Sequence, residues 1–260
     1  MMTESPPEDT VVRTDLPGIP GAVMLRINRP EVKNALGPRD ILLLSKHLFD
    51  CHHDPAVKVV LLTGTGDAFC AGADLKQMNQ RTPEQRSEGG EAATELMLRI
   101  VSMPKIVVAA VNGATAGLGN HIAICSDLCL AREDANFHFT GATKGIPSLQ
   151  MGALVLPMMI GLKRAKALVL RGGKVSARRA EELGFCNEVI SADQWEAQLE
   201  QLAAEFSDRK AGTMAQNKYQ MNQLVYQQIG ALKLSSLAGA GQLAAAGQLI
   251  TGRLANEVAR

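Results

Sequence analysis

Two glycine-rich turns, each directly after an apolar strand, are the feature of the sequence that most suggests chemistry. The first follows the strand predicted at Val57–Leu62 and reads TGDAFCAGADL; the second follows the strand predicted at Lys105–Val111 and reads NGATAGLGN. Short apolar, β-branched runs are typical of buried parallel strands, and glycines let backbone N–H groups approach a bound molecule closely. Two such turns can direct two amides at one oxygen and so form an oxyanion hole. The pattern therefore predicts chemistry on a carbonyl compound, with neither a metal nor a nucleophilic side chain.

Composition narrows the class of protein. A chain of 260 residues, 46% of them hydrophobic, can bury a large core, as one domain or one and a half. The net charge of +1 and the lack of a basic run interleaved with aromatic residues argue against nucleic acid as a partner. No segment approaches the ~20 consecutive apolar residues of a membrane span. Five cysteines without a pairing pattern predict reduced thiols and a cytoplasmic location, and no spacing of histidine, cysteine or acidic residues predicts a metal site.

The elements that must position the turns follow from periodicity and capping. Strands are expected at Ala22–Ile27, 128–131 and 136–139, and helices at Pro38–His53 and 82–102, the latter begun by a Thr82/Gln85 capping box. From about residue 149 the pattern is helical, at 149–161, 164–171, 176–183 and 192–207, with a short strand at 188–190. The repeated strand–helix–strand spacing fits either a spiral of such units or an open doubly wound sheet. We expect a flexible N-terminus (1–10), a core (11–195) and a helical region (196–260) that packs on another subunit.

Four segments resemble the enoyl-CoA hydratase/isomerase family, also called the crotonase superfamily. They are RINRPEVKNALG (Arg26–Gly37), GDAFCAGADLKQM (Gly66–Met78), AAVNGATAGLGNHIAICSDLCLA (Ala109–Ala131) and the helical region Gly161–Ile190. The resemblance implies an α/β spiral of ββα units with a C-terminal α-helical trimerisation region, assembled as a homotrimer or a dimer of trimers. It also implies an acyl-CoA thioester substrate and an enolate-like intermediate, with coenzyme A as part of the substrate and no separate cofactor.

The resemblance also assigns site residues. The backbone N–H groups of Ala73 and Leu118 match the two oxyanion donors. The positions expected to contact the CoA arm or the substrate are Lys33, Ala35, Leu36, Ala71, Asp74, Leu75, Lys76, Gly117 and Gly141. Lys33 and Lys76 are suited to the phosphates of CoA.

The sequence departs from the family at the positions that matter for the reaction. His121 and Gly141 stand where family members that hydrate enoyl-CoA have two glutamates, and Leu118 replaces a glycine in the second turn. Hydration by paired carboxylates is therefore not expected. His121, in the first turn of a predicted helix, is either a general acid/base or a non-catalytic histidine. Asn120 either orients a substrate oxygen or caps that helix, and His138 is a further candidate for the site.

Three functions remain open on these residues. The first is an acyl-CoA enzyme that uses one histidine for isomerisation, lyase chemistry or thioester cleavage. The second is a hydrolase of the same fold that cleaves β-diketones without CoA. The third is a non-catalytic binding member. The width of the acyl pocket is expected to depend on residues 79–94, a polar segment that contains Gly89 and Gly90.

Overall fold

The computed structural model describes residues 9–145 and 150–228, and it divides the chain into two compact units, Met1–Gln220 and Met221–Arg260. The predicted flexible N-terminus, the start of the helix at 149–161 and most of the predicted helical tail lie wholly or partly outside the described residues.

A six-stranded sheet forms the centre of the first unit, with the order β1-β2-β3-β5-β7-β10. Its strands are β1 (Val11–Asp15), β2 (Ala22–Ile27), β3 (Val59–Gly64), β5 (Ile106–Val111), β7 (Leu128–Arg132) and β10 (Glu188–Ile190). β1 is antiparallel to β2, and all other neighbours are parallel. Every residue of β3 and β5 is buried, which is why both read as continuous apolar runs.

A second, four-stranded sheet lies beyond the carboxyl ends of the first. Its order is β4 (Ala68–Cys70), β6 (Ala114–Ala116), β8 (Asn136–Phe139) and β9 (Gly173–Ser176). The chain runs three times from the first sheet into the second and then into a helix: β3 to β4, β5 to β6, and β7 to β8. This is a spiral of ββα units, so the spiral prediction is confirmed and the open doubly wound sheet is wrong.

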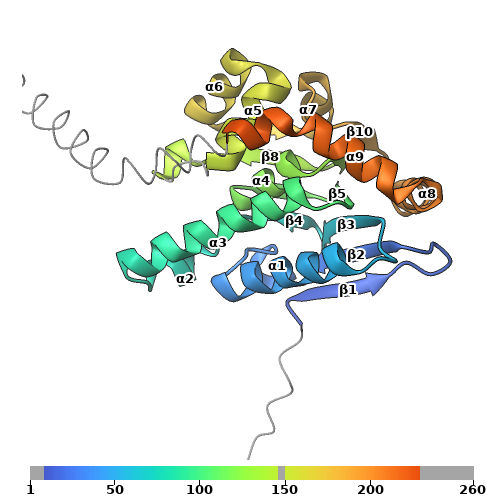
Figure 1. Cartoon of the computed structure of the whole chain (residues 1–260). Helices are drawn as coiled ribbons and strands as arrows, with labels where there is room; N and C mark the ends of the chain where they lie inside the picture. Colours follow the sequence, from blue (N-terminus) through green and yellow to red (C-terminus); the bar gives the residue numbers. More distant parts are fainter. Residues whose placement is uncertain (1–8, 146–149, 229–260) are drawn as a thin grey trace, which may run out of the picture. The chain divides into compact units, whose positions relative to one another are not determined.

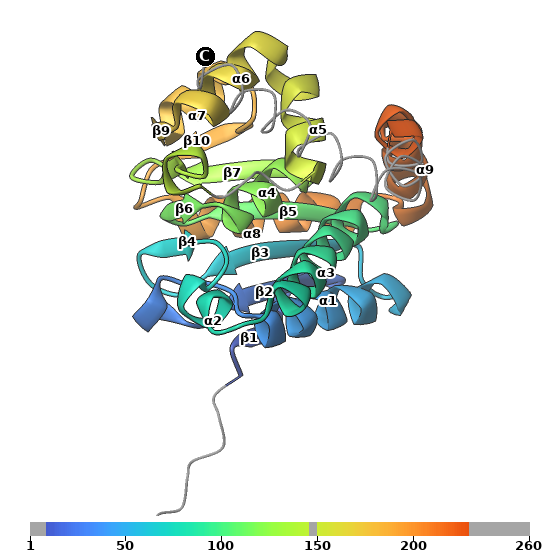
Figure 2. The ribbon, with the colours of Figure 1, turned by 90° about the vertical axis from the view of Figure 1, so that its left-hand side faces the viewer.

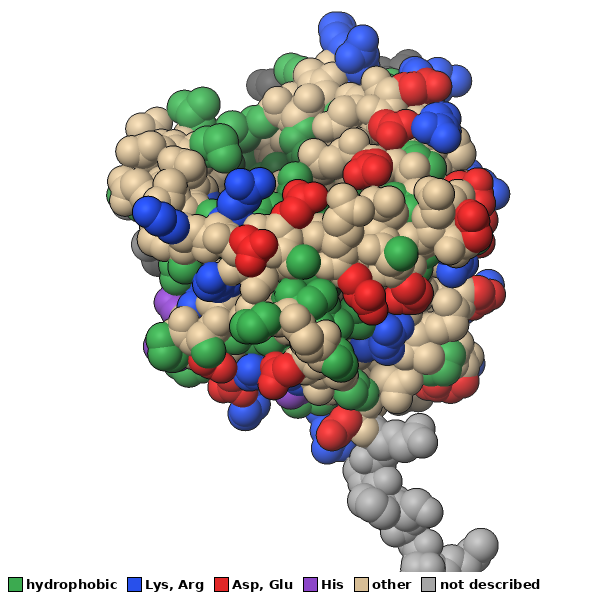
Figure 3. All heavy atoms as spheres, turned by 90° about the vertical axis from the view of Figure 1, so that its right-hand side faces the viewer, with side chains coloured by type: hydrophobic (Ala, Val, Ile, Leu, Met, Phe, Trp, Pro, Cys, Tyr) green, Lys and Arg blue, Asp and Glu red, His purple; other side chains and the backbone are tan. Residues whose placement is uncertain are grey.

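Helices cover both faces of the larger sheet (Figures 1 and 2). On one side lie α1 (Pro38–His53) and α3 (Pro83–Ser102); on the other lies α8 (Trp195–Asp208), which packs Trp195 and Leu199 against side chains of β3 and β5. The remaining helices are α2 (Leu75–Asn79), α4 (Leu118–Cys125), α5 (Gln150–Ile160), α6 (Leu162–Arg171), α7 (Ala177–Leu183) and α9 (Ala211–Met221), with short 3-10 turns at Pro30–Val32 and Ala142–Lys144. On the face seen in Figure 3, acidic and basic side chains are interspersed.

Local signals placed several of these elements. α1 begins at Pro38, and α3 begins after Thr82, whose hydroxyl accepts a hydrogen bond from the Gln85 amide while the Gln85 side chain accepts one from the Thr82 amide. The predicted capping box is therefore confirmed. All five cysteines are free and buried. None of the helices in the described ranges is long and apolar enough to span a membrane.

Candidate active site

The two glycine turns lie against each other. Gly72 and Gly117 have φ angles of 100° and 51°, which side-chain-bearing residues rarely adopt. A Cβ atom at Gly72 would lie 2.9 Å from the carbonyl oxygen of Ala116 and 3.3 Å from the backbone nitrogen of Leu118. Only glycine therefore allows the first turn to approach the amide of Leu118 so closely.

The amides of Ala73 and Leu118 are both free at this contact. The Leu36 amide donates to the Gly72 carbonyl (2.8 Å), and the Asp74 amide donates to the Leu36 carbonyl (2.9 Å), so the Ala73 amide faces away from Leu36. Leu118 is the first residue of α4, where a helix provides no acceptor for the N–H group. Within the residues that the structure describes, neither amide has a protein acceptor. Both N–H groups are therefore available to a bound acceptor.

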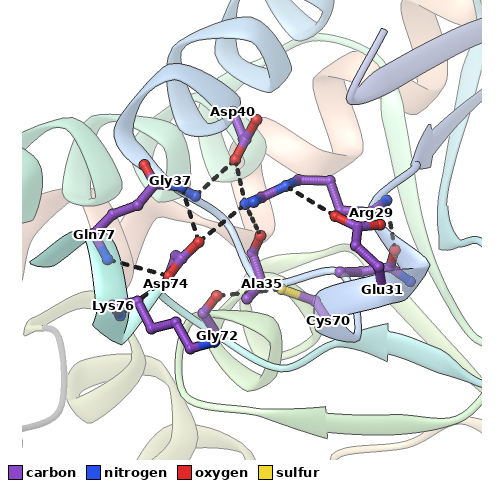
Figure 4. Close-up of polar contacts among 11 residues, drawn as sticks. Arg29, Glu31, Ala35, Gly37, Asp40, Cys70, Gly72, Asp74, Lys76 and Gln77 are labelled. Carbon is purple, nitrogen blue, oxygen red and sulfur yellow. Dashed lines mark hydrogen bonds and ion pairs between the residues drawn. The ribbon is translucent and has the colours of Figure 1, made fainter. Parts of the chain in front are cut away.

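A buried charge network holds the first turn in place (Figure 4). The Arg29 guanidinium donates to the carbonyl of Ala35 (2.7 Å) and to the carboxylates of Asp40 (2.9 Å) and Asp74 (3.3 Å). The Asp74 carboxylate also caps α2 by accepting from the amides of residues 76 and 77. Burial alone would raise the pKa of Asp74, but hydrogen bonds from Gln77 and Arg29 hold that pKa below its ordinary value. The carboxylate of Asp74 is thus committed to the turn itself and does not line the cavity beside it.

Two buried asparagines, which sequence reasoning left without a role, tie the turns to the strands. Asn34 has a positive φ of 57°, and its side-chain amide donates to the carbonyls of Thr65 (2.9 Å) and Ala68 (2.7 Å). Asn112 accepts a hydrogen bond from the Gly64 amide (3.0 Å). Asparagine tolerates a positive φ, which is the signal that could have singled out Asn34. Both residues fix the point at which each strand passes into its turn.

The free amides face a cavity of about 200 Å³ between the two turns and α3, here called the α3 cavity. Of the predicted site residues, it is lined by Leu36, Ala71, Ala73, Leu75, Gly117, Leu118, His121 and Gly141. Lys33, Ala35, Asp74 and Lys76 do not line it. Residues 85, 89, 90 and 93 of α3, together with Arg81 just before it, form one side of the cavity, within the segment expected to set the pocket width. Its charged or titratable lining groups in the described part of the chain are Arg81, His121 and Lys144, without a carboxylate.

His121 lines the α3 cavity beside the second glycine turn. It lies on α4, three residues after Leu118, and is only 9% exposed. Its ring packs on Gly152 of α5, where a Cβ atom would lie 1.6 Å from Nδ1, and Nδ1 has no partner among the described residues. Nε2 is therefore the nitrogen that can reach a bound molecule. Burial lowers the pKa of His121 to about 4, so the ring is neutral at pH 7.

Asn120 does not cap α4. Gly117 occupies the N-cap position, and the Asn120 side chain donates to the carbonyl of His138 (2.9 Å). The capping interpretation is therefore wrong, because the side chain joins α4 to β8. Sequence proximity to the helix start suggested a cap, but the neighbouring strand supplies the carbonyl that this amide binds.

A second cavity of about 250 Å³, here called the α5–α6 cavity, adjoins the first. Both cavities are bordered by Gly117, His121, Thr140 and Gly141. His138 lines the second cavity; its pKa is lowered by partial burial and by the positive charges of Lys174, Lys144 and Lys33. Cationic side chains from three separate segments therefore lie near enough to His138 to act on its charge.

Comparisons with known proteins identify the family of this chain. Residues 20–234 match the family model described as enoyl-CoA hydratase/isomerase. A crotonyl-CoA hydratase of Syntrophomonas wolfei is 32% identical over 69% of this chain and 70% of its own length. A 1,2-epoxyphenylacetyl-CoA isomerase of Escherichia coli is 32% identical over 70% of this chain and 71% of its own. The crystal structure of an enoyl-CoA hydratase from Bacillus anthracis superposes with a TM-score of 0.80 at 26% identity, covering 96% of this chain and 97% of the other. The chain belongs to the enoyl-CoA hydratase/isomerase family.

Proposed function

We propose that this protein is an enzyme that binds an acyl-CoA thioester and stabilises its enolate with the backbone amides of Ala73 and Leu118. The observation that carries the proposal is the contact between the two glycine turns, which leaves both amides free at one cavity. Enolisation places negative charge on the thioester oxygen, and a single preorganised donor of this kind lowers the barrier by about 3 kcal/mol. CoA enters as part of the substrate, so the proposal needs no separate cofactor.

Positive charge around the cavities supports a CoA ester over an uncharged ketone. Lys33, Lys144 and Lys174 lie close enough to His138 to lower its pKa, and Arg81 and Lys144 line the α3 cavity. CoA carries several phosphate charges, which such cations attract. A hydrolase for neutral β-diketones would not require these cations, because its substrate carries no negative charge.

The reaction we propose uses one acid/base group, His121. No carboxylate lines either cavity in the described part of the chain, so the water-activating pair of a hydratase is missing there. A single histidine suits a proton transfer from one carbon of the acyl group to another, as in double-bond isomerisation. Because a pKa of about 4 makes His121 a weak base, most of the driving force for enolisation must come from the two amides.

The assembly we propose is a homotrimer or a dimer of trimers in the cytoplasm. Exposed apolar side chains on α5 and α6 support a subunit contact there: Met158, Met159 and Leu162. Sedimentation equilibrium tests it, with three or six times the chain mass expected and a monomer contradicting it.

Thermal denaturation with CoA, acetyl-CoA and acetoacetyl-CoA tests the proposed function. A ligand at 100 times its Kd that binds only the folded state adds about 2.7 kcal/mol of stability, which raises the midpoint by several degrees. The largest rise is expected for acetoacetyl-CoA, because it forms an enolate most readily. A rise with CoA alone and no added effect of an acyl group would indicate a non-catalytic binding protein. No rise with any of them would favour the CoA-independent hydrolase.

A further inference from the structure

The α5–α6 cavity begins where the oxyanion turns end. Gly117, His121, Thr140 and Gly141 belong to the walls of both cavities. A thioester oxygen held by Ala73 and Leu118 would place the α-carbon of the acyl group beside this shared wall. From there an acyl group can extend either toward α3 or into the α5–α6 cavity.

The two directions differ in chemistry. The α3 cavity combines apolar side chains with the cationic side chains of Arg81 and Lys144; its apolar lining includes Leu36, Pro38, Ile41, Leu75 and Met78. The α5–α6 cavity is also lined by apolar side chains, those of Ile124, Phe139, Leu156, Val169 and Leu170, but the described residues around it include no lysine or arginine. Each methylene buried against these side chains adds favourable transfer free energy, and in the second cavity this burial takes no lysine or arginine out of water.

The size of the α5–α6 cavity limits what it can hold. A dry apolar cavity of about 150 Å³ is enough for benzene. At about 250 Å³, this cavity has room for one ring or a branched chain but not for a long fatty acyl tail. Small residues on α5, Gly152 and Ala153, keep it open beside His121.

We propose that the α5–α6 cavity is the acyl subsite, and that the substrate carries a compact apolar acyl group, a ring or a branched chain, that lies between α4, β8, α5 and α6. This inference rests on the proposed acyl-CoA function and names its substrate class. In this arrangement His121 lies between the thioester and the acyl group, beside the carbons whose protons it would move.

Isothermal titration calorimetry on the full chain tests the subsite with CoA, acetyl-CoA and phenylacetyl-CoA. We expect phenylacetyl-CoA to bind about tenfold or more tightly than acetyl-CoA. Ala153→Phe fills the cavity from an exposed position of α5 and is expected to abolish this preference while leaving the affinity for CoA unchanged. Val169→Trp fills it from α6 and serves as a second variant. Ala167→Phe, an equal change at an exposed position of α6 that lines neither cavity, is the control and should keep the preference.

The outcomes separate this inference from the function on which it rests. If CoA itself does not bind, the proposed function fails. If CoA binds but phenylacetyl-CoA binds no better than acetyl-CoA, or if both filling variants keep the preference, the acyl group lies elsewhere and the subsite is overturned. If palmitoyl-CoA matches phenylacetyl-CoA in the wild type and loses no affinity in Ala153→Phe, the acyl group extends toward α3, which also overturns it.

Discussion

Gly152→Ala tests whether the position of His121 depends on the missing side chain at residue 152. The new Cβ atom would lie 1.6 Å from Nδ1, whereas ordinary contact begins near 3.4 Å, so the ring or α5 must move by roughly 2 Å. Overpacking of this kind costs about 1–3 kcal/mol. Urea denaturation should show that loss in unfolding free energy, and turnover should fall because the displaced ring no longer presents Nε2 to the cavity.

Two further variants make the prediction refutable. Gly90→Ala is the matched control. Gly90 also lies on a helix, but no atom lies within 4 Å of the Cβ that alanine would add. The unfolding free energy of this variant should rise by up to about 1 kcal/mol, because alanine has the higher helix propensity. In a His121→Ala background the clash is removed, and Gly152→Ala should then cost no stability. If the cost of Gly152→Ala is the same with and without the His121 ring, the reasoning is refuted.

Three other predictions concern buried charge. Burial lowers the pKa of His121 to about 4 from 6.5, so the unfolded chain takes up the proton first as the pH falls; stability is lost between pH 6.5 and 4, by about 3 kcal/mol in all. Urea denaturation at pH 7 and pH 4 should show this loss in the wild type but not in His121→Gln, and equal losses would contradict it. Arg29→Met leaves two buried carboxylates without their cation and should cost about 3–5 kcal/mol in the same assay; a cost below 1 kcal/mol would mean that the network in Figure 4 does not hold the turn. Lys218→Met should cost a similar amount, because its ammonium donates to Asp127 (2.7 Å) and to two backbone carbonyls inside the protein, whereas Lys46→Met, which breaks an exposed pair, should cost less than about 1 kcal/mol.

The sequence predicts best where one local signal decides the element. Proline at residue 38 and the helical period of apolar residues after it predicted both ends of α1 correctly, and the mainly apolar run Ala22–Ile27 predicted both ends of β2. Strands of three residues, β4 and β6, were missed because their pairing depends on the turns that flank them and not on a hydrophobic period.

In the candidate site, too, some features were predicted from the sequence and others became visible only in the structure. Family resemblance identified the turns of Ala73 and Leu118, and the structure places both amides at one cavity. The resemblance could not reveal the packing of His121 on Gly152, because the two residues are on different helices and meet only through tertiary contact. The role of Asp74 was likewise hidden, because its partner Arg29 is 45 residues away.

Infrared spectroscopy of a bound acyl-CoA with a ¹³C-labelled thioester carbonyl tests the central claim most directly. Two hydrogen bonds to that oxygen should lower the carbonyl stretching frequency below its value in water. Leu118→Pro removes one donor at the first position of α4, where proline suits the helix, and should reverse part of the shift; Leu118→Ala keeps the amide and should keep the shift. A carbonyl frequency that does not change on binding to the wild type would contradict the oxyanion role of Ala73 and Leu118.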